Sequence, residues 1–143
     1  MRYNKEKRRK NLRKTDDLSD FLRFSLENRK ALVVSEEKDD LYALISGWTD
    51  DVSRENSARF PVESSASRYD RIILTDILLK YNGDWDKLLF DVNKRLLPSG
   101  SSYILAFSVV EKQILTDDFL PFLTKNRISH SFSSASDFLL IKF

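Results

Sequence analysis

The sequence contains no cysteine, a single histidine and only three glycines among its 143 residues. Without cysteine the chain cannot form disulfides, thiolate metal sites or a cysteine nucleophile. One histidine, His130, cannot build a histidine metal site alone, and any catalytic triad would have to use it. We therefore expect no metal, and we interpret His130 as a packed or half-exposed residue of a strand.

Long apolar runs are also missing. No run approaches the roughly 20 residues that a membrane-spanning helix needs, and the N-terminus lacks the apolar region of a secretory signal. We therefore expect no membrane partner and a location in the cytoplasm or nucleus. The chain is 41% hydrophobic and has 10 phenylalanines and 2 tryptophans, which suits one domain with a sizeable core.

The net charge of +2 conceals an uneven distribution. Residues 1–14 hold eight basic side chains and one acidic one, a charge of +7, whereas the rest of the chain is mildly acidic. We interpret residues 1–14 as a basic disordered tail and residues 15–143 as a single folded domain. Such a tail can be a solvated terminus, or it can bind RNA through phosphate contacts. Tyr3 is its only aromatic residue, so base stacking is not encoded there.

The stretch from Arg68 to Phe107 has the clearest pattern in the sequence. Residues 71–74 read Arg-Ile-Ile-Leu, an apolar run of strand length that Thr75 and Asp76 close. Apolar residues then recur at steps of three and four between residues 84 and 97, as on one face of a helix. Pro98-Ser99-Gly100 should stop this helix, and residues 103–107 form a second strand-like run. Strand, helix and strand in this order predict a βαβ unit in a parallel sheet.

These residues resemble the second half of the class I S-adenosylmethionine-dependent methyltransferases. The segment Tyr69–Asp76 is similar to that family's fourth strand, "(Phe/Tyr)-Asp-x-Ile-apolar-x-x-Asp". Residues 96–100 resemble its "Leu-Leu-x-Pro-Gly-Gly" turn, with Ser99 in place of one glycine. The segment after the strand also resembles the Asp-x-x-Tyr of small protein-lysine methyltransferases, although Leu79 stands at the tyrosine position. The resemblance implies a Rossmann-like α/β sandwich, a mostly parallel sheet and S-adenosylmethionine as cofactor.

Further elements can be predicted around this unit. We expect helices at about 16–28 and 41–48, and a final helix that begins at Thr116-Asp117-Asp118. Short strands are expected at 31–34, 60–62, 128–133 and 137–143, whereas residues 49–58 have no period and should form a loop. The last two strands fit the antiparallel hairpin that closes the methyltransferase sheet.

The front half departs from the family because no glycine follows a front-half strand. Glycine lets the backbone approach the methionine and ribose parts of the cofactor without a Cβ clash. Two alignments are open. In the first, residues 31–34 are the first strand of the family, and the acidic loop 35–40 replaces the glycine loop. In the second, residues 31–34 are its second strand and residues 60–62 its third. The first strand would then be absent.

The resemblance also implies candidate site residues. Asp76 lies at the end of a strand, where it would position a methyl acceptor or the adenosyl end of the cofactor; otherwise it is a capping or loop carboxylate. Under the second alignment, Glu36 or Glu37 would accept hydrogen bonds from the ribose, and Glu63 would meet the adenine. The alternative for these acids is a solvated loop.

Three functions from different classes follow. The first is a small methyltransferase that acts on protein or RNA, in which positioning of the acceptor dominates. The second is a degenerate, methyltransferase-like scaffold that works with a partner and has lost the glycine loop. The third is an RNA- or ribosome-associated protein that binds through residues 1–14. We favour a degenerate or partner-dependent form, and we expect a homodimer or heterodimer because a shortened sheet exposes an edge.

Overall fold

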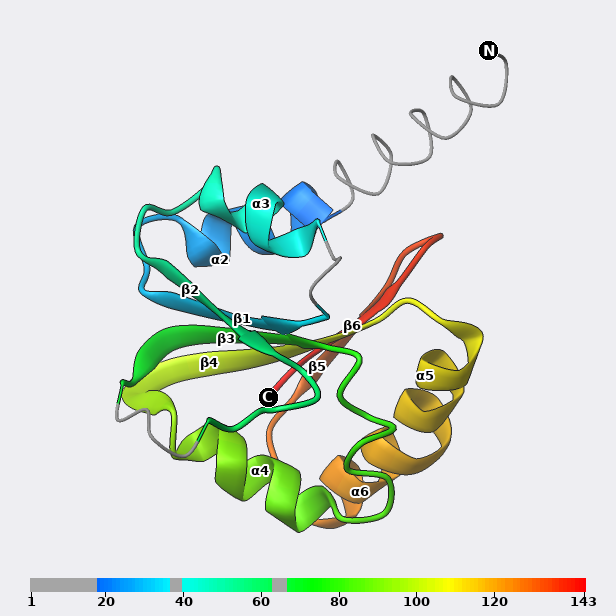
Figure 1. Ribbon diagram of the computed structural model, residues 1–143. Helices are drawn as coiled ribbons and strands as arrows, with labels where there is room; N and C mark the ends of the chain where they lie inside the picture. Colours follow the sequence, from blue (N-terminus) through cyan, green and yellow to red (C-terminus); the bar gives the residue numbers. More distant parts are fainter. Residues whose placement is uncertain (1–17, 37–39, 63–66) are drawn as a thin grey trace, which may run out of the picture.

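A computed structural model describes residues 18–36, 40–62 and 67–143. Six strands form one sheet in the order β2-β1-β3-β4-β6-β5 (Figure 1). Their bounds are Ala31–Ser35 for β1, Val52–Asn56 for β2, Tyr69–Thr75 for β3, Leu96–Ala106 for β4, Ser131–Ser134 for β5 and Leu139–Lys142 for β6. The first four strands are parallel, and β5 and β6 form an antiparallel hairpin on the edge of β4. The expected Rossmann-like α/β architecture with a closing hairpin is confirmed.

Helical segments cover both faces of this sheet (Figure 1). One face carries η1 (Ser19–Arg23), α2 (Phe24–Leu26) and α3 (Leu41–Ser46), and the other carries α4 (Trp85–Asn93), α5 (Val109–Ile114), η2 (Leu115–Phe119) and α6 (Leu120–Lys125). Two hydrophobic clusters follow from this arrangement, one on each face. No helix in the described parts of the chain is long and apolar enough to cross a membrane.

Alternation within the strands feeds both clusters. In β1, Leu32 and Val34 belong to the cluster on the α4 face, while Ala31 and Val33 belong to the cluster under η1 and α3. All five residues of β1 are buried because helices or connecting segments cover both sides. Interior parallel strands therefore read as continuous apolar runs, which is why residues 31–34 and 71–74 were recognisable in the sequence.

The expected helix over residues 84–97 is too long. It ends at Asn93, and β4 begins only three residues later, at Leu96. The segment 97–100, expected to be a turn, forms a bulge within β4. Tyr69 pairs with Leu96 and Arg71 pairs with Ser101, so the four residues 97–100 lie opposite the single residue Asp70 of β3. Pro98 is tolerated there because a bulge needs no ladder hydrogen bond from it. A Cβ on Gly100 would lie 3.0 Å from the carbonyl oxygen of Asp70, so this close approach requires glycine.

Two expectations between residues 49 and 62 are wrong. The supposed loop contains β2, whose Val52 pairs with Ala31 at the edge of the sheet. An edge strand needs no apolar period, because its strand character comes from backbone pairing with β1. Residues 60–62 form no strand and instead carry the cis Phe60-Pro61 bond. The second alignment is therefore wrong, and β1 corresponds to the first strand of the doubly wound order.

The chain reaches β3 from β2 through the segment 57–68. It crosses the α4 face of the sheet, where Phe60 is buried in the cluster that also holds Trp85 (Figure 1). A parallel connection needs about a dozen residues. The described residues of this connection, 57–62 and 67–68, form neither a helix nor a strand. The front of the sheet therefore has two strands, where the classic order has three.

The final helical stretch also begins earlier than expected. Val109 and Val110 open α5 and do not extend a strand, and residues 116–118 lie inside the continuous helical stretch 109–125. The N-terminal helix ends at Leu26, ahead of Asn28 with its positive φ of 58°. Asparagine tolerates this left-handed conformation, which ends helices. The helix expected at 41–48 is confirmed as α3, and the hairpin strands are shorter than expected.

Candidate functional site

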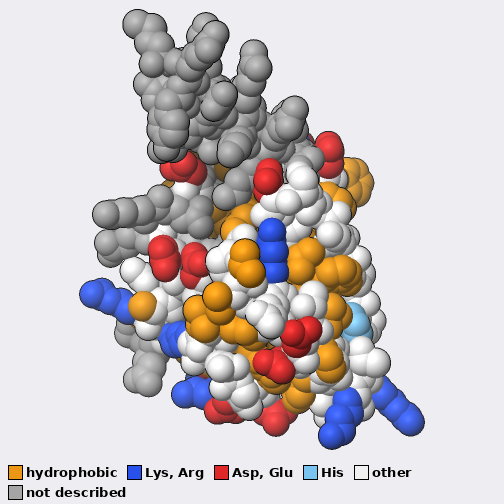
Figure 2. All heavy atoms as spheres, turned by 90° about the vertical axis from the view of Figure 1, so that its right-hand side faces the viewer, with side chains coloured by type: hydrophobic (Ala, Val, Ile, Leu, Met, Phe, Trp, Pro, Cys, Tyr) orange, Lys and Arg blue, Asp and Glu red, His pale blue; other side chains and the backbone are white. Residues whose placement is uncertain are grey.

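The strand order reverses between β1 and β3. From β1 the chain moves outward to β2, and it then returns to place β3 and β4 on the other side of β1. In open α/β sheets, ligands bind outside the carboxyl ends of the strands at such a switch point. Here these ends are Ser35-Glu36 and Thr75-Asp76. Figure 2 faces this edge of the molecule and shows exposed hydrophobic side chains mixed with carboxylates.

Asp76, the predicted catalytic residue, lies at this edge. It is exposed and has a φ of 54°, so the backbone turns sharply as it leaves β3. The preceding Thr75 is fully buried and donates a hydrogen bond to the Val34 carbonyl oxygen at 3.4 Å. This contact fixes the ends of β1 and β3 against each other. Asp76 therefore lies at the carboxyl end of β3, and its role toward a methyl acceptor or the cofactor stays a prediction.

Glu111 joins Asp76 at this edge, and our sequence analysis did not find it. The side chain is 3% exposed, and its Oε1 accepts a hydrogen bond from the Leu79 backbone N–H at 3.4 Å. Among the described residues, Oε2 has no hydrogen-bond partner. Burial raises the pKa of Glu111, and the negative charge of Asp76 raises it further, against the backbone N–H groups of residues 78 and 79. Glu111 is therefore buried at this edge, whereas Asp76 is exposed.

A sequence signal for Glu111 does exist. Ser108 caps α5, and its Oγ accepts a hydrogen bond from the Glu111 N–H at 3.1 Å. Ser-x-x-Glu is the capping-box pattern. It would have placed the helix start, and hence Glu111, directly after the carboxyl end of β4. Here the glutamate side chain reaches across to the loop after β3 and not back to its own cap.

The loop after β1 does not provide a glycine cradle. Ser35 is fully buried, and its Oγ has no partner among the described residues. Glu36 is exposed, and its carbonyl oxygen accepts a hydrogen bond from the Arg54 guanidinium. Glu36 follows β1, which is the first strand. The expectation that Glu36 stands at the end of a second strand, where it would accept hydrogen bonds from the ribose hydroxyls, is therefore wrong. Glu37 and Glu63 lie outside the described residues.

The carboxylate on the true second strand is Glu55, and it has other partners. It faces the α4 side of the sheet, as its register partner Val34 does, and its two oxygens bind the two terminal nitrogens of Arg95. Both side chains are buried, 10% and 4% exposed. Oε1 also accepts the Val62 N–H at 3.0 Å. At the end of β2, the Asn56 side chain caps its own turn by accepting the Ala58 N–H at 2.9 Å.

Lys80 bridges this edge. Its ammonium donates to the carbonyl oxygens of Ser57 at 3.3 Å and Ala58 at 3.2 Å, and also to that of Phe60. Lys80 comes from the loop after β3, whereas its partners follow β2, and β1 lies between these strands. Burial lowers the pKa of Lys80, opposed by the negative charge of Asp91. The lysine therefore ties together the two loops that flank the end of β1.

The remaining sequence candidates lie away from the edge or have structural contacts. His130 is half-buried between α6 and β5, with its Nδ1 2.7 Å from the Ile128 carbonyl oxygen. Asp70 accepts the Lys30 N–H at 3.2 Å at the opposite end of the sheet. Trp85 is buried, and Trp48 packs partly buried against the other cluster. The described residues contain no group of three or more histidine and carboxylate side chains that could hold a metal ion.

Comparison with known proteins identifies the fold. No protein-family model matches the chain, and no curated protein matches it in sequence. Solved structures do match. Precorrin-6y C5,15-methyltransferase from Geobacter metallireducens GS-15 aligns with a TM-score of 0.56 at 11% identity, over 84% of this chain and 82% of that protein. The DhpI complex with SAM and HEP gives 0.53 at 13% identity, over 78% and 77%.

An rRNA methylase from Streptococcus thermophilus is also similar, with a TM-score of 0.50 at 12% identity over 86% of this chain and 90% of that protein. These three proteins differ in the substrates that their names record. The chain therefore has the Rossmann-like fold of the class I S-adenosylmethionine-dependent methyltransferases, as the resemblance of residues 69–76 and 96–100 predicted. At these identities the similarity establishes the fold alone.

Proposed function

We propose that this chain is a degenerate methyltransferase-fold subunit that does not hold S-adenosylmethionine by itself and works with a protein partner. The observation that carries the proposal is the Lys80 ammonium, bound to three backbone carbonyls across the end of β1. A ligand at the switch point lies outside the carboxyl ends of the strands, between the loops that follow them. Here the Lys80 side chain connects the loops after β2 and β3, which flank the end of β1.

The missing cofactor contacts support the same conclusion. A glycine turn would let the backbone approach the methionine part, but Ser35 and Glu36 follow β1. The ribose hydroxyls are typically bound by a carboxylate at the end of the second strand. Glu55 is instead held in a buried ion pair with Arg95. The Glu55 carboxylate therefore stabilises the fold and is not available to a ribose.

The part of the edge formed by the loop after β3 and the start of α5 is better suited to contact another protein than to bind RNA. Leu79, Val109 and Val110 are 56%, 80% and 52% exposed. The Leu79 N–H binds Glu111, and Val109 and Val110 directly precede Glu111 in α5. Exposed apolar side chains in a group mark interaction sites. The neighbouring carboxylates of Asp76 and Glu111 would repel the phosphates of RNA. These features favour a protein partner, either a second copy of the chain or a different subunit.

Calorimetric titration with S-adenosylmethionine and S-adenosylhomocysteine tests the proposal. We expect no binding by the isolated chain up to about 1 mM ligand, which corresponds to about −4 kcal/mol. Lys80→Met should be titrated beside Lys87→Met, an exposed control on α4. Micromolar binding by the unmodified chain would overturn the proposal. Light scattering of the same sample separates a second copy of the chain, which gives a dimer, from a different partner, which leaves a monomer.

A second candidate is a self-sufficient methyltransferase acting on protein or RNA. It is favoured by the carboxyl pair of Asp76 and Glu111 and by two buried oxygens without partners, Ser35 Oγ and Glu111 Oε2. A bound ligand would supply those partners. Micromolar cofactor binding that weakens in Asp76→Ala or Glu36→Ala would support this candidate and justify a search for methyl acceptors.

RNA binding by residues 1–14 stays a prediction, since that segment lies outside the described residues. Phosphate contacts from eight basic side chains would make RNA affinity fall steeply with salt. Deleting residues 1–14 should abolish that salt dependence. RNA affinity that does not respond to the deletion would remove the prediction.

A further inference from the structure

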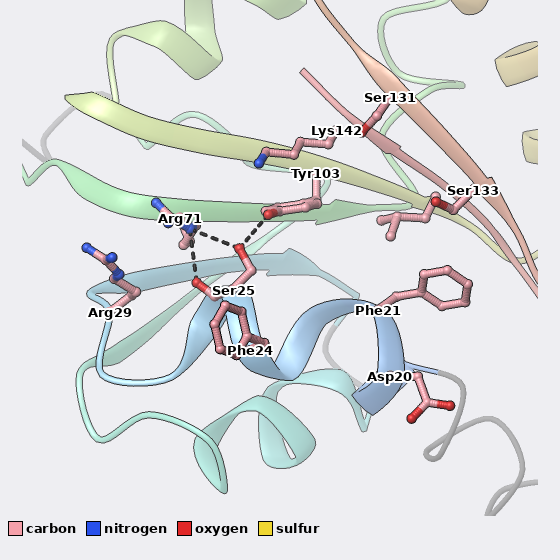
Figure 3. A pocket seen from close by; sticks show the side chains of 11 residues that line it. Asp20, Phe21, Phe24, Ser25, Arg29, Arg71, Tyr103, Ser131, Ser133 and Lys142 are labelled. Atoms are coloured by element: carbon pink, nitrogen blue, oxygen red, sulfur yellow. Dashed lines mark hydrogen bonds between the residues drawn. The ribbon is translucent and has the colours of Figure 1, made fainter.

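A cavity lies on the face of the sheet opposite Glu111 and Lys80. It has a volume of about 520 Å³ and opens between the helical segment 19–26 and the strands β3, β4, β5 and β6 (Figure 3). Small-molecule sites in proteins have volumes of about 300–1,000 Å³. The cavity is therefore large enough for a ligand, and the methyltransferase edge does not use it.

The centre of the cavity is a fixed polar cluster. Arg71 Nε donates to the Ser25 carbonyl oxygen at 3.0 Å and to Ser25 Oγ at 3.2 Å, and Nη1 donates to the Asp70 carbonyl oxygen at 2.8 Å. Ser25 Oγ in turn lies 2.5 Å from the Tyr103 hydroxyl. Among the described residues, Arg71 Nη2 has no partner. These contacts hold the guanidinium in one orientation and leave donors for a ligand.

The charge of the cavity favours an anion. Arg29, Arg71 and Lys142 line it, against one carboxylate, Asp20. The side chain of Arg29 has no hydrogen bond or ion pair among the described residues. The hydroxyls of Ser131 and Ser133 add further donors. Guanidinium and hydroxyl groups bind phosphate well, because each arginine presents paired N–H donors to the phosphate oxygens.

An aromatic ring stands at the same opening. Phe24 is 93% exposed, and Phe21 in the same helical segment is 41% exposed, whereas Leu22 and Leu26 of that segment are fully buried. Figure 3 shows Phe24 next to Ser25, on the side of the cluster away from Lys142. A bare ring beside cationic groups is the arrangement that stacks a nucleobase while its phosphate is held.

We propose that this cavity binds one nucleotide unit, with the phosphate on Arg29 and Arg71 and the base stacked on Phe24. The nucleotide is either free or part of a single strand of RNA. The site is independent of the proposed function, since it shares no residue with the edge at Asp76. It also differs from RNA binding by residues 1–14, since it depends on a ring and on donors held by the fold.

Fluorescence anisotropy of the full chain with a labelled oligouridylate of about 12 nucleotides tests this proposal. The variants are Phe24→Ala and Arg29→Ala, both exposed positions whose truncation leaves the core intact. Phe90→Ala and Lys94→Ala are the matched controls, an exposed ring and a cation on the opposite face. Each cavity variant should bind about tenfold more weakly, and each control within about twofold of the unmodified chain. Residues 1–14 are present in all variants, so their contribution cancels.

Competition with uridine monophosphate and with inorganic phosphate distinguishes a site for a free nucleotide from a site for an RNA strand or a simple anion. Competition by the mononucleotide supports a free nucleotide, and binding of the oligonucleotide without such competition supports a strand. Inorganic phosphate that competes as well as the mononucleotide, with Phe24→Ala unchanged, would overturn the nucleotide assignment in favour of a simple anion site. Cavity variants that bind like the controls, or no binding at all, would overturn the proposal.

Discussion

The loops after β1 and β2 and the loops after β3 and β4 meet at one edge of the sheet, but their polar groups are used differently. In the front loops, Glu55 and the carbonyls of residues 57, 58 and 60 are engaged by Arg95 and Lys80. After β4, Glu111 has a buried oxygen without a hydrogen-bond partner among the described residues, and Val109 and Val110 just before it are exposed. The polar groups after β2 are therefore engaged by side chains of the fold, whereas Glu111 Oε2 is not.

The difference follows from how the front half was shortened. Among the described residues between β2 and β3, 57–62 and 67–68, there is no helix to cover this part of the α4 face. The segment must be held by side chains, and the nearest polar groups are those at the strand ends. Lys80 and Glu55 accordingly make contacts to residues 57, 58, 60 and 62 of the crossing segment.

Phe60→Ala should destabilise the protein as much as Phe119→Ala does. Both rings are fully buried in the same cluster, one from the crossing segment and one from the helix over the back half. Truncation of a buried phenylalanine costs about 4 kcal/mol. Urea unfolding followed by circular dichroism measures both, with the exposed Phe90→Ala as control. A cost below about 1 kcal/mol for Phe60→Ala alone would show that the crossing segment is not part of the core.

Arg95→Ala should lower the free energy of unfolding by about 3 kcal/mol, because it leaves the Glu55 carboxylate buried without its partner. The exposed pair of Arg23 and Glu27 is the matched control, and Arg23→Ala should cost less than about 1 kcal/mol. A double-mutant cycle with Glu55→Ala isolates the pair. Equal costs for Arg95→Ala and Arg23→Ala would contradict the role assigned to Glu55.

Lys80→Met should cost about 2 kcal/mol, because three carbonyls lose a charged donor. The loss should appear in hydrogen exchange as faster exchange around residues 57–62. Lys87→Met, an exposed lysine on α4, should leave both quantities unchanged. If unfolding and exchange were the same in the two variants, the bridge across β1 would not hold the front loops.

Glu111→Gln should stabilise the protein at neutral pH by about 1 kcal/mol, because a buried carboxylate with an unpartnered oxygen is replaced by a neutral amide. The pKa of Glu111 is raised in the folded protein. The unmodified chain therefore loses stability as the pH rises above the ordinary pKa of glutamate, 4.5, and through the higher folded value.

The advantage of Glu111→Gln should accordingly be absent at low pH and grow as the pH rises. Unfolding curves at a series of pH values measure it. Glu27→Gln, at an exposed glutamate, should show no such growth. An advantage that stays constant with pH would mean that Glu111 does not titrate as a buried carboxyl.

Several features could be predicted because they depend on local pattern. Residues 31–34 and 71–74 read as buried strands since both of their faces are covered, and the spacing from Trp85 to Val92 gives a helix. Asp76 could be placed at the edge because it ends such a strand. Glu111 could also have been found, from the capping box with Ser108.

Other features depend on pairing between distant segments. The residues of β2 have no apolar period and form a strand only because β1 offers them an edge. Leu96 continues the apolar spacing of α4, yet it pairs with Tyr69 in β4. The spacing of apolar residues cannot distinguish a helix residue from a strand residue where pairing with a distant strand determines the conformation.

The doubly wound architecture, the βαβ unit around Asp76 and the lack of a glycine after a front-half strand can be predicted from the amino-acid sequence alone. They follow from the period of apolar residues and from residue identity, which are local properties. Three other features depend on the folded chain: β1 is the first strand, Lys80 and Arg95 hold the crossing segment, and Arg71, Ser25 and Tyr103 line a cavity beside Phe24. These contacts join residues up to 78 positions apart in the chain. Their geometry is set by which strands pair and which faces the helices leave uncovered.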